Sequence, residues 1–144
     1  MSVFIDTNVV LDVMLRRDVF YPASRAVFDI VEANDTSAFV SAVSMTTIFY
    51  ILRKFKQNIA DVYSLMDDLS ALFTIAPVTE STITDAMALR WKDFEDAVQF
   101  MSAQGVGAEC IVTRNKADFE SFGIPCLSPS EYIRPFGSFA YRKD

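Results

Sequence analysis

The sequence predicts an α/β fold, a three-layer sandwich in which helices cover both faces of a central parallel sheet of four to five strands. Three observations predict it. Short apolar runs of strand length alternate with longer segments of helical periodicity. No internal repeat or low-complexity linker interrupts this alternation. A chain of 144 residues, of which 51% are hydrophobic, is long enough for one domain with a single core.

The first third of the chain predicts a strand followed by two helices. Residues 2–6 form a short apolar run that is typical of a buried strand. The apolar positions after it recur at helical spacing and predict a helix that ends near Arg16. Pro22 suits the first turn of a second helix, which Asn34 and Asp35 end.

The middle of the chain predicts two strands with a pair of helices between them. Ser44 is expected to cap the first of these helices, whose buried face is expected to extend to Phe55. The predicted elements are a strand at residues 37–42, a helix at 44–55, a helix at 59–71 and a strand at 73–76.

The last third predicts two helices and two short strands, and then a tail. The predicted elements are helices at residues 80–91 and 93–104 and strands at 109–113 and 125–127. The domain is expected to span residues 1–133. The aromatic and basic tail at 134–144 is expected to be only partly ordered.

Composition limits the chemistry that the chain can perform. The sequence has no histidine, which excludes Ser-His-Asp and Cys-His catalysis, histidine general bases and most zinc sites. The net charge of −6 argues against non-specific affinity for nucleic-acid phosphate unless a cation neutralises the acids. No apolar run is long enough to span a membrane and no secretory signal is visible, so we expect a cytoplasmic protein with Cys110 and Cys126 as buried thiols.

Polar residues follow the predicted strands at the points where the strands end. Asp6 ends the first strand and Thr113 ends the fourth, with Arg114, Asn115 and Asp118 just beyond it. Ligands of parallel sheets bind outside the carboxyl ends of the strands, so these side chains are candidates for a site.

The helix at residues 93–104 adds further acids to the same edge. Asp93 and Asp96 are three residues apart and therefore share a helical face. Phe94 is assigned to the buried stripe of this helix, and Glu95 is expected to point elsewhere.

Each acid also has a purely structural interpretation. Asp6 could cap the helix that follows it, and Asp93 and Asp96 could be an N-cap and its N3 partner. Thr113 and Asn115 could fix their loop through side-chain hydrogen bonds. The combination is more informative, because carboxylates within about 4–6 Å of one another must take up protons or bind a cation. Oxygen ligands without His or Cys suit Mg²⁺ or Mn²⁺, and a phosphodiester is the natural substrate of such a site.

Three motifs, in order along nearly the whole chain, resemble the PIN domain family. They are FIDTNVVLD at the start, DFEDAVQ at residues 93–99 and IVTRNKADF at residues 111–119, and the likeness is greatest to the small VapC-type toxins of bacterial toxin–antitoxin pairs. The resemblance implies an endoribonuclease that depends on Mg²⁺ or Mn²⁺ and leaves 5′-phosphate and 3′-hydroxyl ends. It also implies a protein antitoxin that inserts a segment into the acidic cleft, and a possible homodimer.

The resemblance also implies roles for individual residues. By role, these are the catalytic and metal-binding Asp6, Asp96 and Asp118, the additional metal ligand Asp93, the supporting Asn8, Thr113 and Asn115, and the substrate-binding Arg114 and Lys116. One position departs from the family pattern: Thr47 stands where a glutamate is usual on the helix after the second strand.

Two other functions stay open at this point. Thr47 and Asn115 favour a PIN-fold binding module with reduced or lost catalysis. A phosphotransfer domain or an aspartate-nucleophile phosphatase would also place an aspartate after the first strand. Such phosphatases need a second acid two residues later, where this chain has Asn8.

Overall fold

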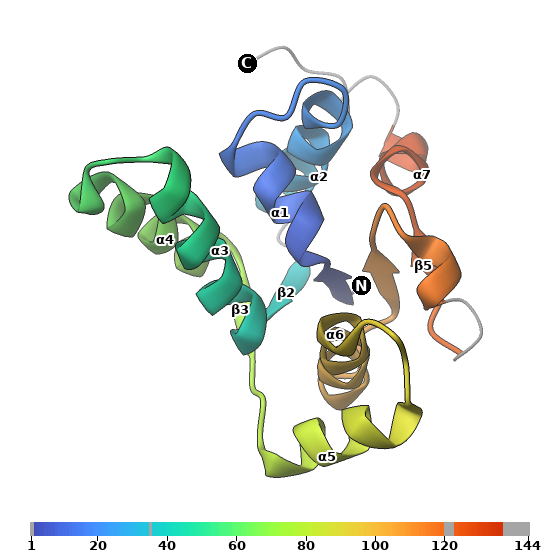
Figure 1. Cartoon of the computed structure of the whole chain (residues 1–144). Coiled ribbons are helices and arrows are strands. Elements are labelled where there is room, and N and C mark those ends of the chain that lie inside the picture. The colour runs from blue at the N-terminus through green and yellow to red at the C-terminus, as the bar shows by residue number, and fades with distance from the viewer. Residues whose placement is uncertain (1, 35, 120–122, 137–144) are drawn as a thin grey trace.

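A parallel sheet of five strands forms the centre of the computed structural model, which describes residues 2–34, 36–119 and 123–136 (Figure 1). The strand order is β3-β2-β1-β4-β5 and every neighbouring pair is parallel. The strands are β1 (Ser2–Ile5), β2 (Ser37–Ser41), β3 (Thr74–Ala76), β4 (Cys110–Val112) and β5 (Cys126–Leu127). The predicted fold class is therefore confirmed, with β1 in the middle of the sheet.

Helices cover both faces of the sheet, as Figure 1 shows. α1, α2 and α7 lie on one side, α5 and α6 lie on the other, and α3 and α4 form a hairpin at the edge carrying β3. The bounds are α1 (Thr7–Met14), α2 (Tyr21–Ala33), α3 (Ala42–Phe55), α4 (Ile59–Leu72), α5 (Glu80–Leu89), α6 (Phe94–Gly105), the 3-10 helix η1 (Lys116–Asp118) and α7 (Pro129–Ile133).

The alternation of side chains along β1 divides the core into two parts. Val3 and Ile5 pack into a cluster that includes Ile30 of α2, whereas Phe4 packs into a second cluster with Phe100 of α6. Successive side chains of a strand point to opposite faces of the sheet, so each face needs its own helical layer. The apolar character of β1 follows from its burial on both faces.

Three expectations about helix faces were wrong. Ser41, not Ser44, is the N-cap of α3, and its hydroxyl accepts a hydrogen bond from the Val43 amide. Ser44 lies buried inside the first turn. Phe55 is 69% exposed because α3 ends there, at the tip of the hairpin away from the sheet (Figure 1). Phe94 is 47% exposed because the buried face of α6 begins at Asp96.

Several smaller expectations have clear outcomes. Cys110 and Cys126 are buried free thiols, as predicted, and burial raises the pKa of Cys110 to about 11. Within the described ranges, no helix has the length and hydropathy to cross a bilayer. The ring of Phe136 packs against Tyr132 of α7 at 5.8 Å between centroids. Residues 137–144 of the expected tail lie outside the described residues.

Candidate active site at the carboxyl edge of the sheet

Asp6 directly follows the central strand and is the most buried acid of the predicted site. Its side chain is 3% exposed. Gln99 Nε2 donates to its Oδ1 at 2.9 Å, and Thr113 Oγ1 donates to its Oδ2 at 2.7 Å. Asp6 occupies the N-cap position of α1, where its side chain makes no capping hydrogen bond of standard geometry, although the Thr7 and Asn8 amides lower its pKa.

Burial raises the pKa of the Asp6 carboxyl above its usual range. The hydrogen bonds from Thr113 and Gln99 oppose this shift but do not cancel it. Desolvation disfavours the ionised form of a carboxyl group, and hydrogen bonds to the anion favour it. Desolvation outweighs these hydrogen bonds, so ionisation of the Asp6 carboxyl costs more free energy in the folded protein than in water.

A small polar network holds Gln99 in its orientation. Its Oε1 accepts from the Thr7 amide at 3.1 Å, so its Nε2 faces Asp6. The Thr7 hydroxyl lies 2.7 Å from Ser44 Oγ and 3.0 Å from Glu95 Oε1. The Ser44 hydroxyl in turn donates to Gln99 Oε1 at 3.5 Å, so Glu95, Thr7, Ser44 and Gln99 form one hydrogen-bonded chain.

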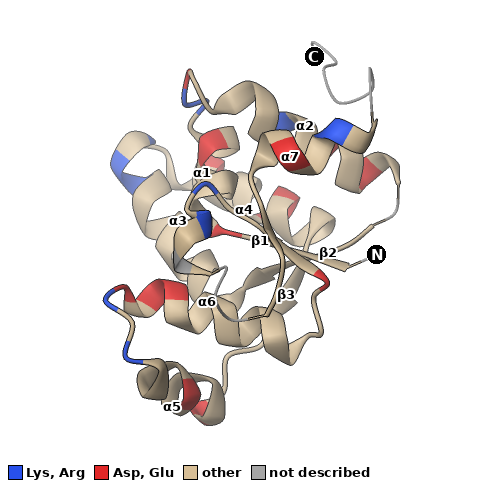
Figure 2. Cartoon of the chain, turned by 90° about the vertical axis from the view of Figure 1, so that its right-hand side faces the viewer, with Lys and Arg blue, Asp and Glu red and all other residues tan. Residues whose placement is uncertain are grey.

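The start of α6 brings its acids to the same edge. Asp93 is the N-cap of α6, and its Oδ1 accepts from the Asp96 amide at 3.0 Å. The interpretation of Asp93 as a helix N-cap is therefore confirmed. Asp96 is buried in the first turn. Figure 2 shows acidic residues gathered where α6 begins.

Glu95 faces the site, so the expectation that it points elsewhere was wrong. Its Oε1 accepts the hydrogen bond from Thr7, the residue next to Asp6. Burial raises the pKa of Glu95, the Thr7 hydrogen bond lowers it, and the charges of Asp6 and Asp93 raise it further. Side chains of the first helical turn extend over the helix start, so a carboxylate beside Asp96 can reach the same space.

A cavity of about 180 Å³ joins these groups. Its lining includes four acids: Asp6, Asp93, Glu95 and Asp96. The remaining lining residues are Thr7, Asn8, Leu11, Thr47, Ile51 and Gln99. Of the predicted site residues, the structure thus brings Asp6, Asn8, Asp93 and Asp96 together around the cavity, and it places Thr113 against Asp6.

Sequence reasoning missed four polar residues of this site: Thr7, Ser44, Glu95 and Gln99. One signal was available. Gln99 interrupts the apolar run of its helix and lies four residues after Glu95, which places both on one helical face. A polar residue in a buried stripe needs hydrogen-bond partners, and here they are Asp6 and Thr7.

The loop after β4 is fixed by Thr113 and Arg114. Thr113 is fully buried, and its Oγ1 also accepts from the Asn115 amide at 3.0 Å, as the structural interpretation of this pair predicted. Arg114 lies with its guanidinium 3.7 Å from the ring centre of Phe20 and pairs with the fully buried Asp12. Its Nε and Nη2 donate to the two carboxylate oxygens of Asp12 at 2.9 and 3.1 Å.

The same loop is tied to α7 through Lys116. Its Nζ donates to Glu131 Oε1 at 2.7 Å, and the same oxygen accepts from the Ser128 amide at 2.9 Å. The two predicted substrate-binding cations, Arg114 and Lys116, are thus both ion-paired with acids of this chain. Asp118 ends η1, but its side chain lies outside the described residues.

A complete set of metal ligands is not assembled within the part of the chain that the structure describes. No three acidic or thiol side chains there are close enough together to hold an ion. The chemistry of the donors nevertheless fits a hard divalent cation, because all acids lining the 180 Å³ cavity offer carboxylate oxygens.

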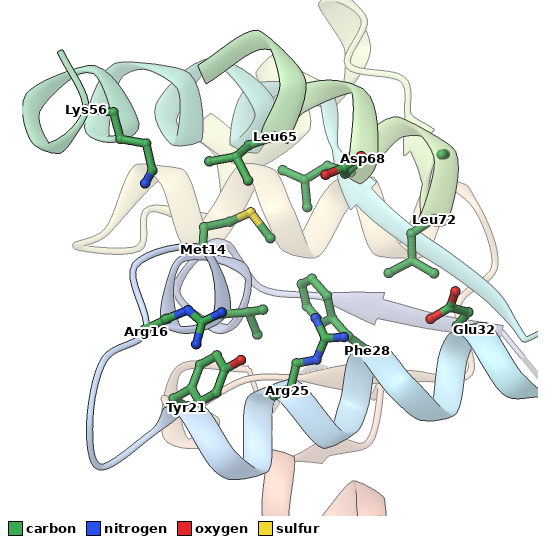
Figure 3. Close-up of a pocket in the computed structure, with 13 residues that line it drawn as sticks. Met14, Arg16, Tyr21, Arg25, Phe28, Glu32, Lys56, Leu65, Asp68 and Leu72 are labelled. Atoms are coloured by element: carbon green, nitrogen blue, oxygen red, sulfur yellow. The ribbon is translucent and has the colours of Figure 1, made fainter. Parts of the chain in front are cut away.

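A second, larger cavity of about 640 Å³ lies between α1, α2 and α4 and shares no lining residue with the 180 Å³ cavity (Figure 3). Met14 and Leu65 face one another across it. Its basic lining residues are Arg16, Arg25 and Lys56, and its acidic ones are Glu32 and Asp68. Figure 3 shows Arg16 and Lys56 on one side of the cavity and Glu32 on the other.

These features define the class of protein, an α/β domain with an acid-lined cavity at the carboxyl edge of a five-stranded parallel sheet. The family model for the PIN domain matches residues 2–117, so the chain belongs to the PIN domain family. The resemblance drawn from the three motifs is confirmed.

Particular relatives agree with this assignment. The chain is 28% identical over 138 residues to "Ribonuclease VapC1" of Aquifex aeolicus (strain VF5), covering 91% of this chain and 92% of that protein. It is similar in structure to VapBC2 from Rickettsia felis bound to a DNA fragment from its promoter, with a TM-score of 0.67 and 14% identity, covering 89% and 98% of the two chains. A toxin–antitoxin complex from Klebsiella pneumoniae gives a TM-score of 0.62 and 23% identity, covering 88% and 97%.

Replacing Arg114 should destabilise the fold. Arg114→Met keeps an apolar stem over Phe20 but leaves the buried Asp12 with Arg17 Nη1 at 3.4 Å and Ser24 Oγ at 3.2 Å. Loss of one partner of a buried pair costs about 3 kcal/mol of unfolding free energy. Urea denaturation measures it, and Arg134→Met at the exposed end of α7 is the control. Equal stability of the two variants would contradict a structural role for Arg114.

The ion pair between Lys116 and Glu131 should make stability depend on pH. Hydrogen bonding to Lys116, followed by that to the Ser128 amide, lowers the pKa of Glu131 from 4.5 to about 2. The ionised group therefore stabilises the fold above pH 4.5, and this contribution is lost as the pH falls from about 4.5 to about 2.

Glu131→Gln tests this sign, since glutamine keeps an oxygen for the Ser128 amide and removes only the charge. The wild type should be more stable than the variant at pH 7, and the difference should vanish near pH 2. Denaturant unfolding at several pH values measures it. A difference that stays constant over this range would show that the ion pair contributes nothing.

Proposed function

We propose that this protein is a divalent-metal-dependent endoribonuclease and the toxin of a toxin–antitoxin pair. The 28% identical relative is named a ribonuclease, and the two structural neighbours are described as a VapBC assembly and a toxin–antitoxin complex. The observation in this chain that carries the proposal is Asp6. Its buried carboxylate has only neutral hydrogen-bond partners among the described residues and lines a cavity with three further acids.

Mg²⁺ or Mn²⁺ is the cofactor that the donors favour. Aspartate and glutamate oxygens are hard ligands, and the chain has no histidine to select zinc. We propose that Asp6 and Asp96 hold the ion, with Asp93 and Asp118 as further acids. A bound divalent cation would lower the pKa of a water molecule and stabilise negative charge that develops on the phosphoryl oxygens.

The remaining residues of the site prepare these acids. Gln99 and Thr113 fix both oxygens of Asp6, so the carboxylate is oriented before any ligand binds. Asp93 fixes the first turn of α6 and thereby the backbone of Asp96. Asn8 and Asn115 stay proposed supporting residues. Arg114 and Lys116 stay proposed RNA contacts.

Asp6→Asn should abolish RNA cleavage without unfolding the protein. The substitution keeps the size of the side chain but removes the charge that would attract the cation, so we expect at least a 100-fold loss of rate with Mg²⁺. Gel analysis of RNA fragments measures the rate, and circular dichroism controls for folding. Glu80→Gln on α5 should cleave like the wild type. Full activity of Asp6→Asn would refute the proposed function.

The alternative, a PIN-fold binding module without catalysis, is tested by calorimetry. A nuclease of the proposed kind should bind Mn²⁺ in a manner that depends on Asp6, whereas an inactive module should bind the ion weakly or not at all. The observation that favours this alternative is that Thr47, a neutral residue, lies half-buried in the wall of the 180 Å³ cavity.

The antitoxin segment expected in the acidic cleft stays a prediction, and we propose the 640 Å³ cavity between α1, α2 and α4 as a second docking surface for the same partner. Apolar side chains such as Met14 and Leu65 line it and suit the apolar face of a helix. Arg16 and Lys56 on one side favour an acidic residue of the partner at that end. The expected homodimer stays a prediction, for which the exposed Tyr50 and Tyr63 of the α3–α4 hairpin offer a surface.

Reversing the charge at this end of the cavity should weaken antitoxin binding. Arg16→Glu combined with Lys56→Glu is expected to raise the dissociation constant at least tenfold, since like charges then meet across the interface. Surface plasmon resonance with the antitoxin measures it, and Arg134→Glu is the control. RNA cleavage by the free double variant should be unchanged. Unaltered antitoxin affinity would place the partner elsewhere.

A further inference from the structure

The α3 wall of the acid-lined cavity provides no carboxylate. α3 contributes Thr47 and Ile51 to the lining, and none of its residues, Ala42–Phe55, is acidic. The acids of the described lining come from the end of β1 and the start of α6 alone. A divalent cation in this cavity would therefore face a neutral wall on the α3 side.

Glu95 reaches into this space from α6. Its Oε1 is held at 3.0 Å by the Thr7 hydroxyl, which in turn is held by Ser44 of α3 at 2.7 Å. Two helices and the residue after Asp6 therefore fix the direction of this carboxylate. An exposed glutamate on a solvated helix face would need no such support.

The acidic residues around Glu95 also favour a bound cation. Glu95 is half-buried and lines the same cavity as Asp6, Asp93 and Asp96. Among the described residues, no lysine or arginine is ion-paired with Asp6 or Glu95. Carboxylates that share a cavity without a basic partner are stabilised by a cation between them.

We propose that Glu95 is a metal-facing carboxylate of this site and supplies from α6 the negative charge that α3 lacks at Thr47. The inference rests on the proposed function, because it assigns a further residue to the cation that Asp6 and Asp96 hold. It concerns Mg²⁺ or Mn²⁺ bound by this chain in the absence of RNA. The Thr7–Glu95 hydrogen bond keeps the carboxylate in position before the ion arrives.

Titration of the full-length protein with Mn²⁺ by calorimetry tests the proposal without relying on activity. Glu95→Gln keeps an oxygen for the Thr7 hydroxyl and removes the charge, so the fold should be retained while the Mn²⁺ dissociation constant rises at least tenfold. Glu80→Gln is the matched control, since Glu80 is also an acid in the first turn of a helix. Its Mn²⁺ affinity should stay within twofold of the wild type.

A second variant tests whether the charge, rather than the side chain, is what the site requires. The double variant that combines Thr47→Glu with Glu95→Gln puts a carboxylate on the α3 wall of the same cavity. It should restore the Mn²⁺ dissociation constant to within about threefold of the wild type. Failure of this rescue, with both proteins folded, would overturn the idea that Glu95 replaces an acid on α3.

The outcomes separate this inference from the proposed function. Loss of Mn²⁺ binding in Asp6→Asn with wild-type affinity in Glu95→Gln would overturn the role of Glu95 and leave the nuclease proposal intact. Loss of RNA cleavage in Glu95→Gln with unchanged Mn²⁺ affinity would also overturn it, because Glu95 would then act on the RNA. A wild type that neither binds Mn²⁺ nor cleaves RNA would refute both proposals.

Discussion

A buried carboxylate at the end of the central strand is the constraint on which this structure depends. Asp6 accepts hydrogen bonds from Gln99 and Thr113, which lie 93 and 107 residues further along the chain. These two bonds join the carboxyl ends of β1 and β4 to the interior face of α6. Since β1 is the middle strand of the sheet, the Asp6 side chain positions the start of α1, the end of β4 and α6 relative to one another. A displacement of α6 would deprive the buried Asp6 carboxylate of the Gln99 donor, which is costly.

Charged pairs hold the loop after β4 against this edge. Arg114 connects the loop to Asp12 of α1, and Lys116 connects it to Glu131 of α7. The loop carries the backbone of η1, which ends at Asp118, so both pairs position the last acid of the family motif relative to Asp6. The Arg114–Asp12 pair is the stronger anchor, because Asp12 is fully buried and is engaged by two nitrogens of one guanidinium.

Hydrophobic periodicity was enough to find the strands and the main helices, since both depend on local patterns that burial imposes. The site was found in part: strand ends located Asp6 and Thr113, and helical spacing located Asp93 and Asp96. Glu95 was missed because the phase of α6 was taken from Phe94, which turned out to be exposed. α7 was not predicted either, although Ser128 and Glu131 form a capping box before a short apolar stretch. Hydrogen bonds between distant segments, such as Gln99 to Asp6, leave no local pattern in a single sequence.

Two buried aspartates six positions apart differ in their charged partners. Asp12 is fully buried and is neutralised by Arg114 and Arg17. Asp6 is almost as buried, yet its side-chain partners among the described residues are the amide of Gln99 and the hydroxyl of Thr113, and its cavity contains further acids. An ion pair at Asp6 would have compensated its charge in the free protein, as Arg114 and Arg17 do at Asp12. No such pair forms at Asp6 within the described ranges, so the proposed cation would meet a negative charge that no basic group offsets, and the free energy of its binding would offset the cost of burial.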